Sequence, residues 1–296
     1  MKQIGFIGLG RMGSGMSQRL LERGFNVAGY DRTPSVTKSL TKKGLTSAYS
    51  YDELLEKLPN KKIVWLMLPA GKITTEAITN LIKLMNKGDI IIDGANDFYK
   101  NAEKHAKLCK KKGVHFFDCG VSGGVHGLKN GYTLMIGGPK SQFKHIEPFC
   151  KALAPKEGYG YFGEVGSGHY VKSVHNIIEY TYLQGLAEGV ELLDKKSIDL
   201  KKATKVWGPA SVINSWLLDL TNKALNKPDF KSVGTEIGSV TIQELNATKN
   251  DVKGYTPAFD VAVKVRRDKN KKRFSLGKRT IAAVRKEFGG HVVKKD

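Results

Sequence analysis

The chain has 296 residues, which is enough for a sizeable buried core and for two domains. Its 40% hydrophobic and 26% charged residues are typical of soluble proteins, and the absence of an apolar run of bilayer length argues against a membrane protein. Three scattered cysteines, Cys109, Cys119 and Cys150, argue against a disulfide scaffold, and no residues have metal-site spacing. We therefore expect a metal-free protein of the reducing cytoplasm.

The formal net charge of +21 comes from 49 Lys and Arg residues against 28 Asp and Glu residues. Such an excess fits a nucleic-acid partner, an anionic small substrate or a biased composition. The lysines are spread over the whole chain, and no basic motif is interleaved with aromatic residues. We therefore do not expect specific nucleic-acid binding, and only the cluster from Lys264 to Arg273 keeps that alternative open.

The first thirty residues predict a strand, a glycine loop, a helix and a second strand. An apolar run at 3–8 precedes the loop, an amphipathic segment follows it to Gly24, and 25–30 is a second apolar run. This order is typical of dinucleotide-binding folds, in which the first glycine allows a tight turn, the second admits the pyrophosphate and the third allows close packing. A purely structural glycine turn is the alternative. We expect the cofactor to contact the loop residues Gly8, Leu9, Gly10, Arg11, Met12 and Gly13.

Asp31 ends the second predicted strand, where a carboxylate can bind the ribose hydroxyls of NAD and repel the 2′-phosphate of NADP. The adjacent Arg32 could instead hold that phosphate. A third interpretation is that Asp31 only caps the helix that begins near Pro34. We favour NAD as the cofactor and keep NADP as the alternative.

Strands and helices continue to alternate, which predicts an α/β domain of the Rossmann type with a mostly parallel sheet. The expected strands are 62–68, 89–93, 114–118 and 133–136, with helices at 99–112 and from about 141. Ligands bind at the carboxyl ends of such strands. There the loops 8–13, 68–71, 94–97 and 119–124 should converge, which adds Leu68, Pro69, Ala70 and Asn96 as cofactor contacts.

From about residue 166 the pattern becomes almost wholly helical. Glycine-rich segments at 157–160 and 163–168 mark the change. We predict a dinucleotide-binding domain over 1–165 and an all-α domain for substrate binding and oligomerisation over 166–296. Its later helices are expected near 199–207, 210–224, 241–249, 256–270 and 276–288.

The first helix of the second domain carries a polar stripe. Lys172, Asn176, Glu179 and Leu183 recur at intervals of four, three and four, and His175 lies beside them. Val171, Val174 and Ile178 fall on another face, which we expect to pack the helix onto a core. A solvated face is the plain interpretation of the polar stripe.

Several motifs resemble the decarboxylating 6-phosphogluconate dehydrogenase family. They are the glycine loop, 68–71 (LPAG), 91–96 (IIDGAN), 118–127 (DCGVSGGVHG), 131–138 (GYTLMIGG), 168–180 (GHYVKSVHNIIEY) and 285–291 (RKEFGGH). The resemblance spans nearly the whole chain, whose length is that of the family's short form. It implies oxidative decarboxylation of 6-phosphogluconate to ribulose 5-phosphate with reduction of NAD or NADP, in the pentose phosphate pathway.

The resemblance also implies roles for the polar stripe. Lys172 would be first the general base and then the general acid, and Glu179 would protonate carbon. The substrate contacts would be Asn96, Ser122, Gly123, Gly124, His175, Asn176, Tyr180, Thr241, Arg267, Arg285 and His291. Arg267 is the best match to a family phosphate arginine, with Arg266 as the alternative.

The sequence differs from the family motifs at two places, and two alternative functions remain. Ser239 and Val240 replace a basic residue and a tryptophan of the family, and Asp97 replaces a serine. The rivals are another β-hydroxyacid dehydrogenase, such as a 3-hydroxyisobutyrate-like enzyme, and a non-catalytic dinucleotide-binding module. The resemblance implies a homo-oligomer, dimer or tetramer, in which the tail bearing Arg285 and His291 completes the partner's site.

Overall fold

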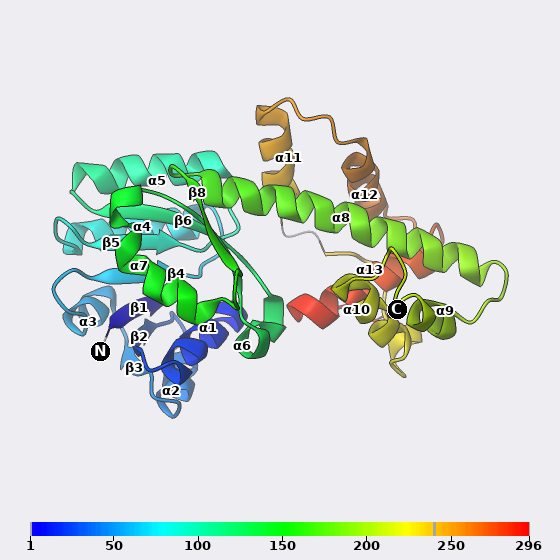
Figure 1. Ribbon diagram of the computed structural model, residues 1–296, viewed down its shortest axis with the longest axis horizontal. Coiled ribbons are helices and arrows are strands. Elements are labelled where there is room, and N and C mark those ends of the chain that lie inside the picture. The colour runs from blue at the N-terminus through cyan, green and yellow to red at the C-terminus, as the bar shows by residue number, and fades with distance from the viewer. Residues whose placement is uncertain (1, 239–240, 296) are drawn as a thin grey trace. The chain divides into compact units, whose positions relative to one another are not determined.

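The computed structural model describes residues 2–238 and 241–295 (Figure 1). The chain forms two compact units, residues 1–173 and residues 174–296. The division falls inside one long helix, eight residues beyond the predicted boundary at 165. The first turns of that helix therefore belong to the first unit.

The first unit is built on one twisted sheet of Rossmann type, as the sequence predicts. In the described residues the strand order is β3-β2-β1-β4-β5-β6-β7-β8, and every neighbouring pair is parallel except β6 with β7. The strands are β1 (Gln3–Ile7), β2 (Asn26–Tyr30), β3 (Thr46–Ala48), β4 (Ile63–Leu66), β5 (Ile90–Asp93), β6 (His115–Ser122), β7 (Thr133–Gly137) and β8 (Tyr159–Gly163).

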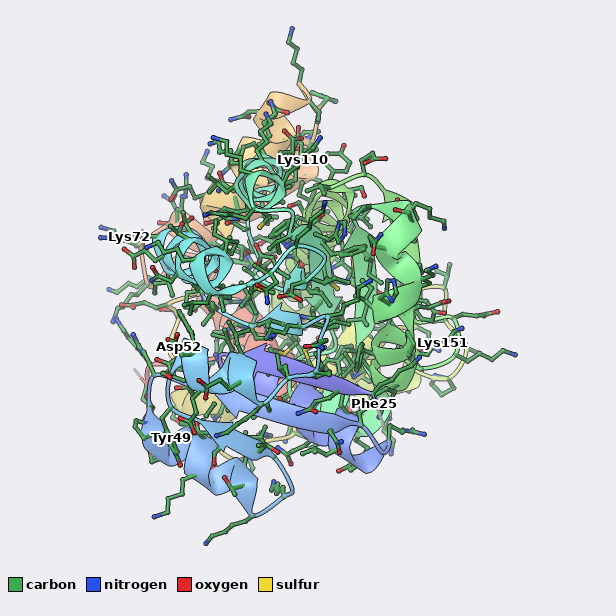
Figure 2. All side chains as sticks on the ribbon, turned by 90° about the vertical axis from the view of Figure 1, so that its left-hand side faces the viewer. Phe25, Tyr49, Asp52, Lys72, Lys110 and Lys151 are labelled. Carbon is green, nitrogen blue, oxygen red and sulfur yellow. The ribbon has the colours of Figure 1, made fainter. Side chains whose placement is uncertain are left out.

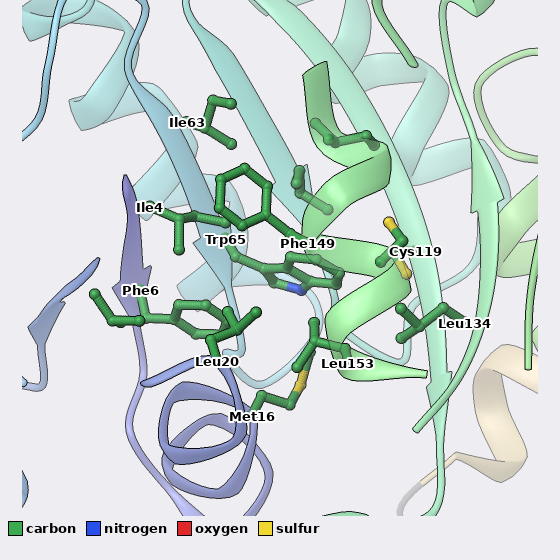
Figure 3. Packing of buried hydrophobic residues seen from close by; sticks show 14 of the residues in the cluster. Ile4, Phe6, Met16, Leu20, Ile63, Trp65, Cys119, Leu134, Phe149 and Leu153 are labelled. Carbon is green, nitrogen blue, oxygen red and sulfur yellow. The ribbon is translucent and has the colours of Figure 1, made fainter. Parts of the chain in front are cut away.

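Helices cover both faces of this sheet, because most of the central strand residues are apolar on both sides. On one face, α1 (Arg11–Glu22) and α7 (Lys140–Leu153) pack Met16 and Phe149 against Phe6 and Trp65 (Figure 3). On the other face lie α3 (Tyr51–Glu56), α4 (Lys72–Leu84) and α5 (Tyr99–Lys111). The remaining helices are α2 (Pro34–Thr41) and α6 (Gly127–Asn130).

Two strands differ from the prediction. β6 does not end at Asp118 but continues to Ser122, because β7 pairs with its last residues in antiparallel register, Ser122 opposite Thr133. β8 lies in the segment expected to be a domain boundary and pairs with β7. Both strands depend on pairing with a distant segment, which local pattern does not reveal.

The second unit is helical, as predicted. It contains most of α8 (Ser167–Asp194), followed by α9 (Leu200–Val206), α10 (Trp216–Leu225), α11 (Ile242–Asp251), α12 (Pro257–Arg267) and α13 (Ser275–Gly289). α13 packs on α10 through an apolar cluster that includes Leu220, Ala224 and Val284. A second cluster joins Tyr180 of α8 to Leu245 of α11 and Phe259 of α12.

The positive charge is distributed over the surface. Figure 2 shows Lys72, Lys110 and Lys151 pointing outward from α4, α5 and α7. Among the described helices, none is long and apolar enough to cross a bilayer.

Candidate functional site

The glycine loop between β1 and α1 is tightly packed at its first and third glycines and open at its second. Gly8 has φ of +87°, in the left-handed region, and a Cβ there would lie 2.4 Å from the carbonyl oxygen of Met67. A Cβ on Gly13 would lie 2.0 Å from the carbonyl oxygen of Gly8, so both positions require glycine. Gly10, the N-cap of α1, is exposed, with no atom within 4 Å of where its Cβ would be. Open space at a helix N-terminus is what a pyrophosphate needs, so the loop fits NAD or NADP.

Asp31 lies at the end of β2 and faces this loop. Its carboxylate accepts hydrogen bonds from the Leu9 N–H (2.8 Å) and the Thr33 N–H (2.8 Å). The second bond is the local contact expected of a residue that precedes α2. The first joins the carboxylate to the cofactor loop itself. The N-cap of α2 is Thr33, without a side-chain cap, so Asp31 does not cap this helix itself. The cofactor role of Asp31 stays a prediction, and Arg32 is exposed.

The loops that follow β4 and β5 are tied together by Asp97. Its buried carboxylate accepts from the Phe98 N–H (2.7 Å) and the Asn101 side chain (2.9 Å), and more weakly from the Gly71 N–H (3.4 Å). The acid that departs from the family pattern therefore joins the 68–71 loop to the start of α5. The neighbouring Asn96 is exposed.

Lys172 lies against the last part of β6. A Cβ on Gly120 would lie 2.3 Å from the Lys172 Cβ, so only glycine allows this approach. Ser122, Gly123 and Gly124 follow directly along the strand and are half-buried. The structure thus brings Lys172 close to the strand that carries the predicted substrate loop.

The polar stripe of α8 is not a solvated face. Lys172 and Asn176 are buried, at 7% and 4% exposure, and Glu179 is half-buried. His175 Nδ1 lies 3.0 Å from the Asn176 side-chain oxygen. The expectation that the other face packs onto a core is wrong for Val174 and Ile178, which are exposed, while Val171 is half-buried. A helix that buries its polar stripe and exposes apolar residues points to a functional rather than a structural stripe.

Ile178 belongs to an apolar groove of about 670 Å³ in the second unit. Ile177, Tyr182 and Leu186 of α8 line one side, and Trp207 and Ile213 also contribute.

Two buried arginines lie beside Tyr180. The Arg266 guanidinium carbon lies 3.5 Å from the centre of the Tyr180 ring, and none of its three nitrogens has a hydrogen-bond partner in the described residues. Burial, together with the nearby charge of Arg285, lowers the pKa of Arg266 to about 10, although Tyr180 and Glu179 partly oppose this shift. Burial also lowers the pKa of Arg285, while nearby Tyr180 and Glu179 partly offset the effect. Two buried guanidinium groups, one of them without a hydrogen-bond partner in the described residues, indicate an anion-binding site.

Only some of the other substrate contacts predicted in the second unit lie near Tyr180. The Thr241 hydroxyl lies 3.3 Å from the Tyr180 hydroxyl, at the same cluster. Arg267 is exposed, so the geometry favours Arg266, the alternative. His291 packs edge-on against Phe288 of its own tail. Ser239 and Val240 lie outside the described residues.

Arg285 lies on α13, which packs within its own unit. A Cβ on Gly238 would lie 3.3 Å from its Nη1. This packing does not test the expectation that Arg285 completes the partner's site, which stays a prediction. The proximity of Arg285 to Tyr180 and Glu179 supports a site within one chain as the alternative.

The sequence of α12 contains a signal that distinguishes Arg266 from Arg267. Phe259, Ala262, Val263 and Arg266 recur at intervals of three, one and three, and all four are buried on one face of α12. That periodicity favours Arg266 over Arg267. Asp118 and His169, which hold the start of α8, gave no comparable signal, because their contacts join segments about fifty residues apart.

The chain is similar to known proteins over nearly its full length. Residues 3–163 match the profile of the NAD binding domain of 6-phosphogluconate dehydrogenase, and residues 168–254 match that of its C-terminal domain. A putative 6-phosphogluconate dehydrogenase of Bacillus subtilis, YqeC, is 33% identical, with 99% of each chain covered. An NAD(+)-dependent, decarboxylating 6-phosphogluconate dehydrogenase of Haloferax volcanii is 36% identical over 80% of this chain and 78% of that protein.

A solved structure shares the fold and part of the sequence. Plasmodium falciparum 6-phosphogluconate dehydrogenase, studied in its apo form, with its cofactor NADP+ and with its substrate 6-phosphogluconate, superposes with a TM-score of 0.79 at 30% identity. The match covers 89% of this chain but only 61% of the Plasmodium chain.

Proposed function

The chain belongs to the 6-phosphogluconate dehydrogenase family of NAD(P)-binding oxidoreductases, and on that premise we propose that it catalyses the oxidative decarboxylation of 6-phosphogluconate to ribulose 5-phosphate and CO2. The observation that carries the proposal is the Arg266 guanidinium, buried against Tyr180 without a hydrogen-bond partner in the described residues and close to Arg285. A substrate phosphate would supply the hydrogen-bond acceptors that the Arg266 guanidinium lacks. An unphosphorylated β-hydroxy acid would leave that need unmet.

The buried stripe of α8 offers the acid and base that this reaction requires. The neutral Lys172 amine takes the proton of the substrate hydroxyl that lies β to the carboxylate, while hydride leaves the same carbon. The resulting β-keto acid loses CO2, and the Lys172 ammonium now returns a proton to the ketone oxygen. Glu179 then protonates the enediol carbon while the neutral Lys172 amine takes the proton of the enol hydroxyl, which gives the ketose. Asn96, Ser122, Gly123, Gly124, His175 and Asn176 are proposed to orient the substrate hydroxyls and carboxylate.

The cofactor would be held by the loop Gly8–Gly13 and by Asp31, with further contacts from Leu68, Pro69, Ala70 and Asn96. When bound, its nicotinamide supplies the hydride acceptor. We propose NAD as the preferred cofactor, because the Asp31 carboxylate faces the loop at Leu9 and would repel a 2′-phosphate. NADP is the alternative.

A homo-oligomer is part of the proposal. The apolar groove along α8, with Ile178 and Tyr255 strongly exposed, supports contact with another copy. For the substrate, we propose that Tyr180, Thr241, Arg266 and Arg285 bind the phosphate within one chain.

The test is a product assay. The purified protein is incubated with 6-phosphogluconate and either NAD or NADP, and reduced nicotinamide and CO2 are followed together. We expect equal amounts of both. Activity on 3-hydroxyisobutyrate or glycerate, with none on 6-phosphogluconate, would overturn the proposal in favour of the other β-hydroxyacid dehydrogenases.

A further inference from the structure

The start of α8 is held by a carboxylate from a distant strand. Asp118 on β6 is fully buried, and its two oxygens accept hydrogen bonds from the Gly166 N–H (2.7 Å) and the His169 N–H (2.8 Å). The first N–H groups of a helix have no partner within the helix itself. A buried anion there also interacts favourably with the positive end of the helix dipole. Asp118 therefore caps α8 from 48 and 51 residues away in the sequence.

A second contact fixes the same helical turn. His169 is buried, and its Nε2 lies 3.1 Å from the carbonyl oxygen of Asp93 on β5. Asp93 and Asp118 are direct register partners in the sheet. The first turn of α8 is thus fixed to two adjacent strands at the same level.

Lys172 lies one turn further along the helix. It follows His169 by three residues. Lys172 packs so closely against Gly120 that a Cβ on Gly120 would lie 2.3 Å from the Lys172 Cβ. Gly120 is itself two residues after Asp118 on β6. A shift of the first turn of α8 would therefore move Lys172 directly against or away from this strand.

We infer that Asp118 is a positioning residue for Lys172, fixing the first turn of α8 so that the lysine side chain is held at the end of β6. The inference rests on the catalytic role proposed for Lys172. Asp118 itself need not touch the substrate.

The sheet contains a matched control. Asp89, just before β5, is also buried, and its carboxylate accepts two backbone hydrogen bonds, from the Lys62 N–H (2.8 Å) and the Asn86 N–H (2.8 Å). It lies at the opposite end of β5 from Asp93, and no helix of the site begins there. A purely structural loss should be similar in the two variants.

The experiment compares Asp118→Asn with Asp89→Asn. Both should lower Tm by a few degrees, about 5 °C each. Only Asp118→Asn should lower kcat, by about 100-fold, the loss expected from a misplacement of roughly 1 Å. The KM for the cofactor should stay within about threefold in both variants, because the glycine loop is untouched. Equal kcat in the two variants would overturn the inference.

His169→Leu keeps the inference testable if Asp118→Asn does not fold. It removes only the contact to Asp93, and we expect kcat to fall about tenfold, in line with a smaller displacement than that caused by loss of the cap. Parental kcat in a folded His169→Leu protein would contradict the inference.

A measurement without substrate separates this inference from the proposed function. The rate at which acetic anhydride acetylates Lys172 is followed by peptide mass spectrometry in the parent and in the variants. We expect an increase of at least about threefold in Asp118→Asn and none in Asp89→Asn, because Lys172 is buried only while the helix start is fixed. If the parent fails to oxidise 6-phosphogluconate, the proposed function fails, while the labelling rates still decide whether Asp118 positions Lys172. Unchanged labelling in Asp118→Asn would overturn the inference.

Discussion

The two units bury the same side chain in opposite ways. Arg19 on α1 of the first unit and Arg266 on α12 of the second are almost equally buried, at 7% and 6% exposure. Arg19 donates hydrogen bonds to the carbonyl oxygens of Leu153 (2.9 Å) and Leu128 (3.1 Å). Arg266 has no hydrogen-bond partner in the described residues and only the face of Tyr180 beneath it.

This difference shows how a buried charged residue that stabilises the fold can be distinguished from one that binds a ligand. A buried charge whose hydrogen bonds are made within the chain stabilises the fold. A buried charge that lacks them costs free energy until a ligand supplies them. The first unit follows the first pattern with Asp89, Asp97 and Asp118 as well, whose carboxylates accept backbone hydrogen bonds. In the second unit Arg266 follows the second pattern.

The largest effect is expected at Lys172, a buried lysine of the first unit that we assign to catalysis. Lys172→Met should lower kcat by about 10³- to 10⁴-fold, because the base and the acid are lost together. NADH binding, followed by fluorescence titration, should be unchanged. Near-normal turnover of 6-phosphogluconate would show that the lysine is structural after all.

The comparison is tested directly by replacing both arginines. Arg266→Met should raise the KM for 6-phosphogluconate about 100-fold without lowering Tm of the ligand-free protein, since an unpaired charge is removed from the interior. Because burial lowers the pKa of Arg266 to about 10, the parent bears this penalty at all pH values below about 10 and loses it as pH rises further.

Two controls accompany this variant. Arg19→Met should lower Tm by several degrees, because buried carbonyl oxygens lose their donors, and should leave KM within about threefold. Arg267→Met, on the exposed neighbour, should change neither quantity. A clear loss of Tm in Arg266→Met, with KM unchanged, would place Arg266 among the structural charges.

A mixing experiment shows whether the buried cations of the second unit serve their own chain. Lys172→Met and Arg285→Ala, each inactive alone, are refolded together in equal amounts. Arg285 packs within its own unit near Tyr180, so we expect the mixture to stay inactive. Recovery of about a quarter of parental activity would show that Arg285 enters the partner's site. Native mass spectrometry confirms that mixed oligomers have formed.

Asp31 is a carboxylate of the first unit that we expect to serve both structure and ligand. Asp31→Asn should raise the KM for NAD about tenfold, because the ribose hydroxyls lose a charged hydrogen-bond acceptor, and should lower the KM for NADP, because the repulsion of the 2′-phosphate disappears. Arg32→Gln is the companion variant and should affect NADP alone. A parent that already prefers NADP strongly would assign the discrimination to Arg32.

The smallest effect is expected from the cysteines, which all lie in the first unit. Burial raises the pKa of Cys109 to about 12 and also raises the pKa values of Cys119 and Cys150. The reactive thiolate is therefore almost absent at pH 8, and iodoacetamide should neither label the folded protein nor inhibit it. Labelling that appears in urea then reports the opening of the first unit. Rapid labelling of the native protein would contradict this packing.

The local parts of the fold could be predicted from the sequence, and the non-local parts could not. The order of strands and helices around the glycine loop follows from periodicity and turn residues within short windows. The end of β6 and the whole of β8 depend on pairing with β7, which no window contains. Likewise the exposure of Val174 and Ile178 is set by what surrounds α8, not by its own pattern.

The candidate site divides in the same way. The motif from Gly168 to Tyr180 could be found in the sequence, because its residues are contiguous. Resemblance to the family motif predicts the exposed Arg267 as the phosphate arginine, whereas the buried face shared with Phe259 and Val263 favours Arg266. The support of Lys172 by Asp118 could not be predicted, because capping normally comes from the residue just before a helix.

The continuous helix α8 also fixes the distance between Lys172 and Glu179. Lys172 and Glu179 are seven residues apart on one continuous helix of 28 residues, so their Cα atoms are separated by about 10 Å along the axis and differ in phase by only about 20°. Neither spacing nor phase depends on any loop. A single residue inserted between them would turn Glu179 by about 100° away from the face of Lys172. An insertion between residues 172 and 179 should therefore abolish the proposed reaction, because the continuous helix alone sets the distance between the two groups proposed to transfer protons.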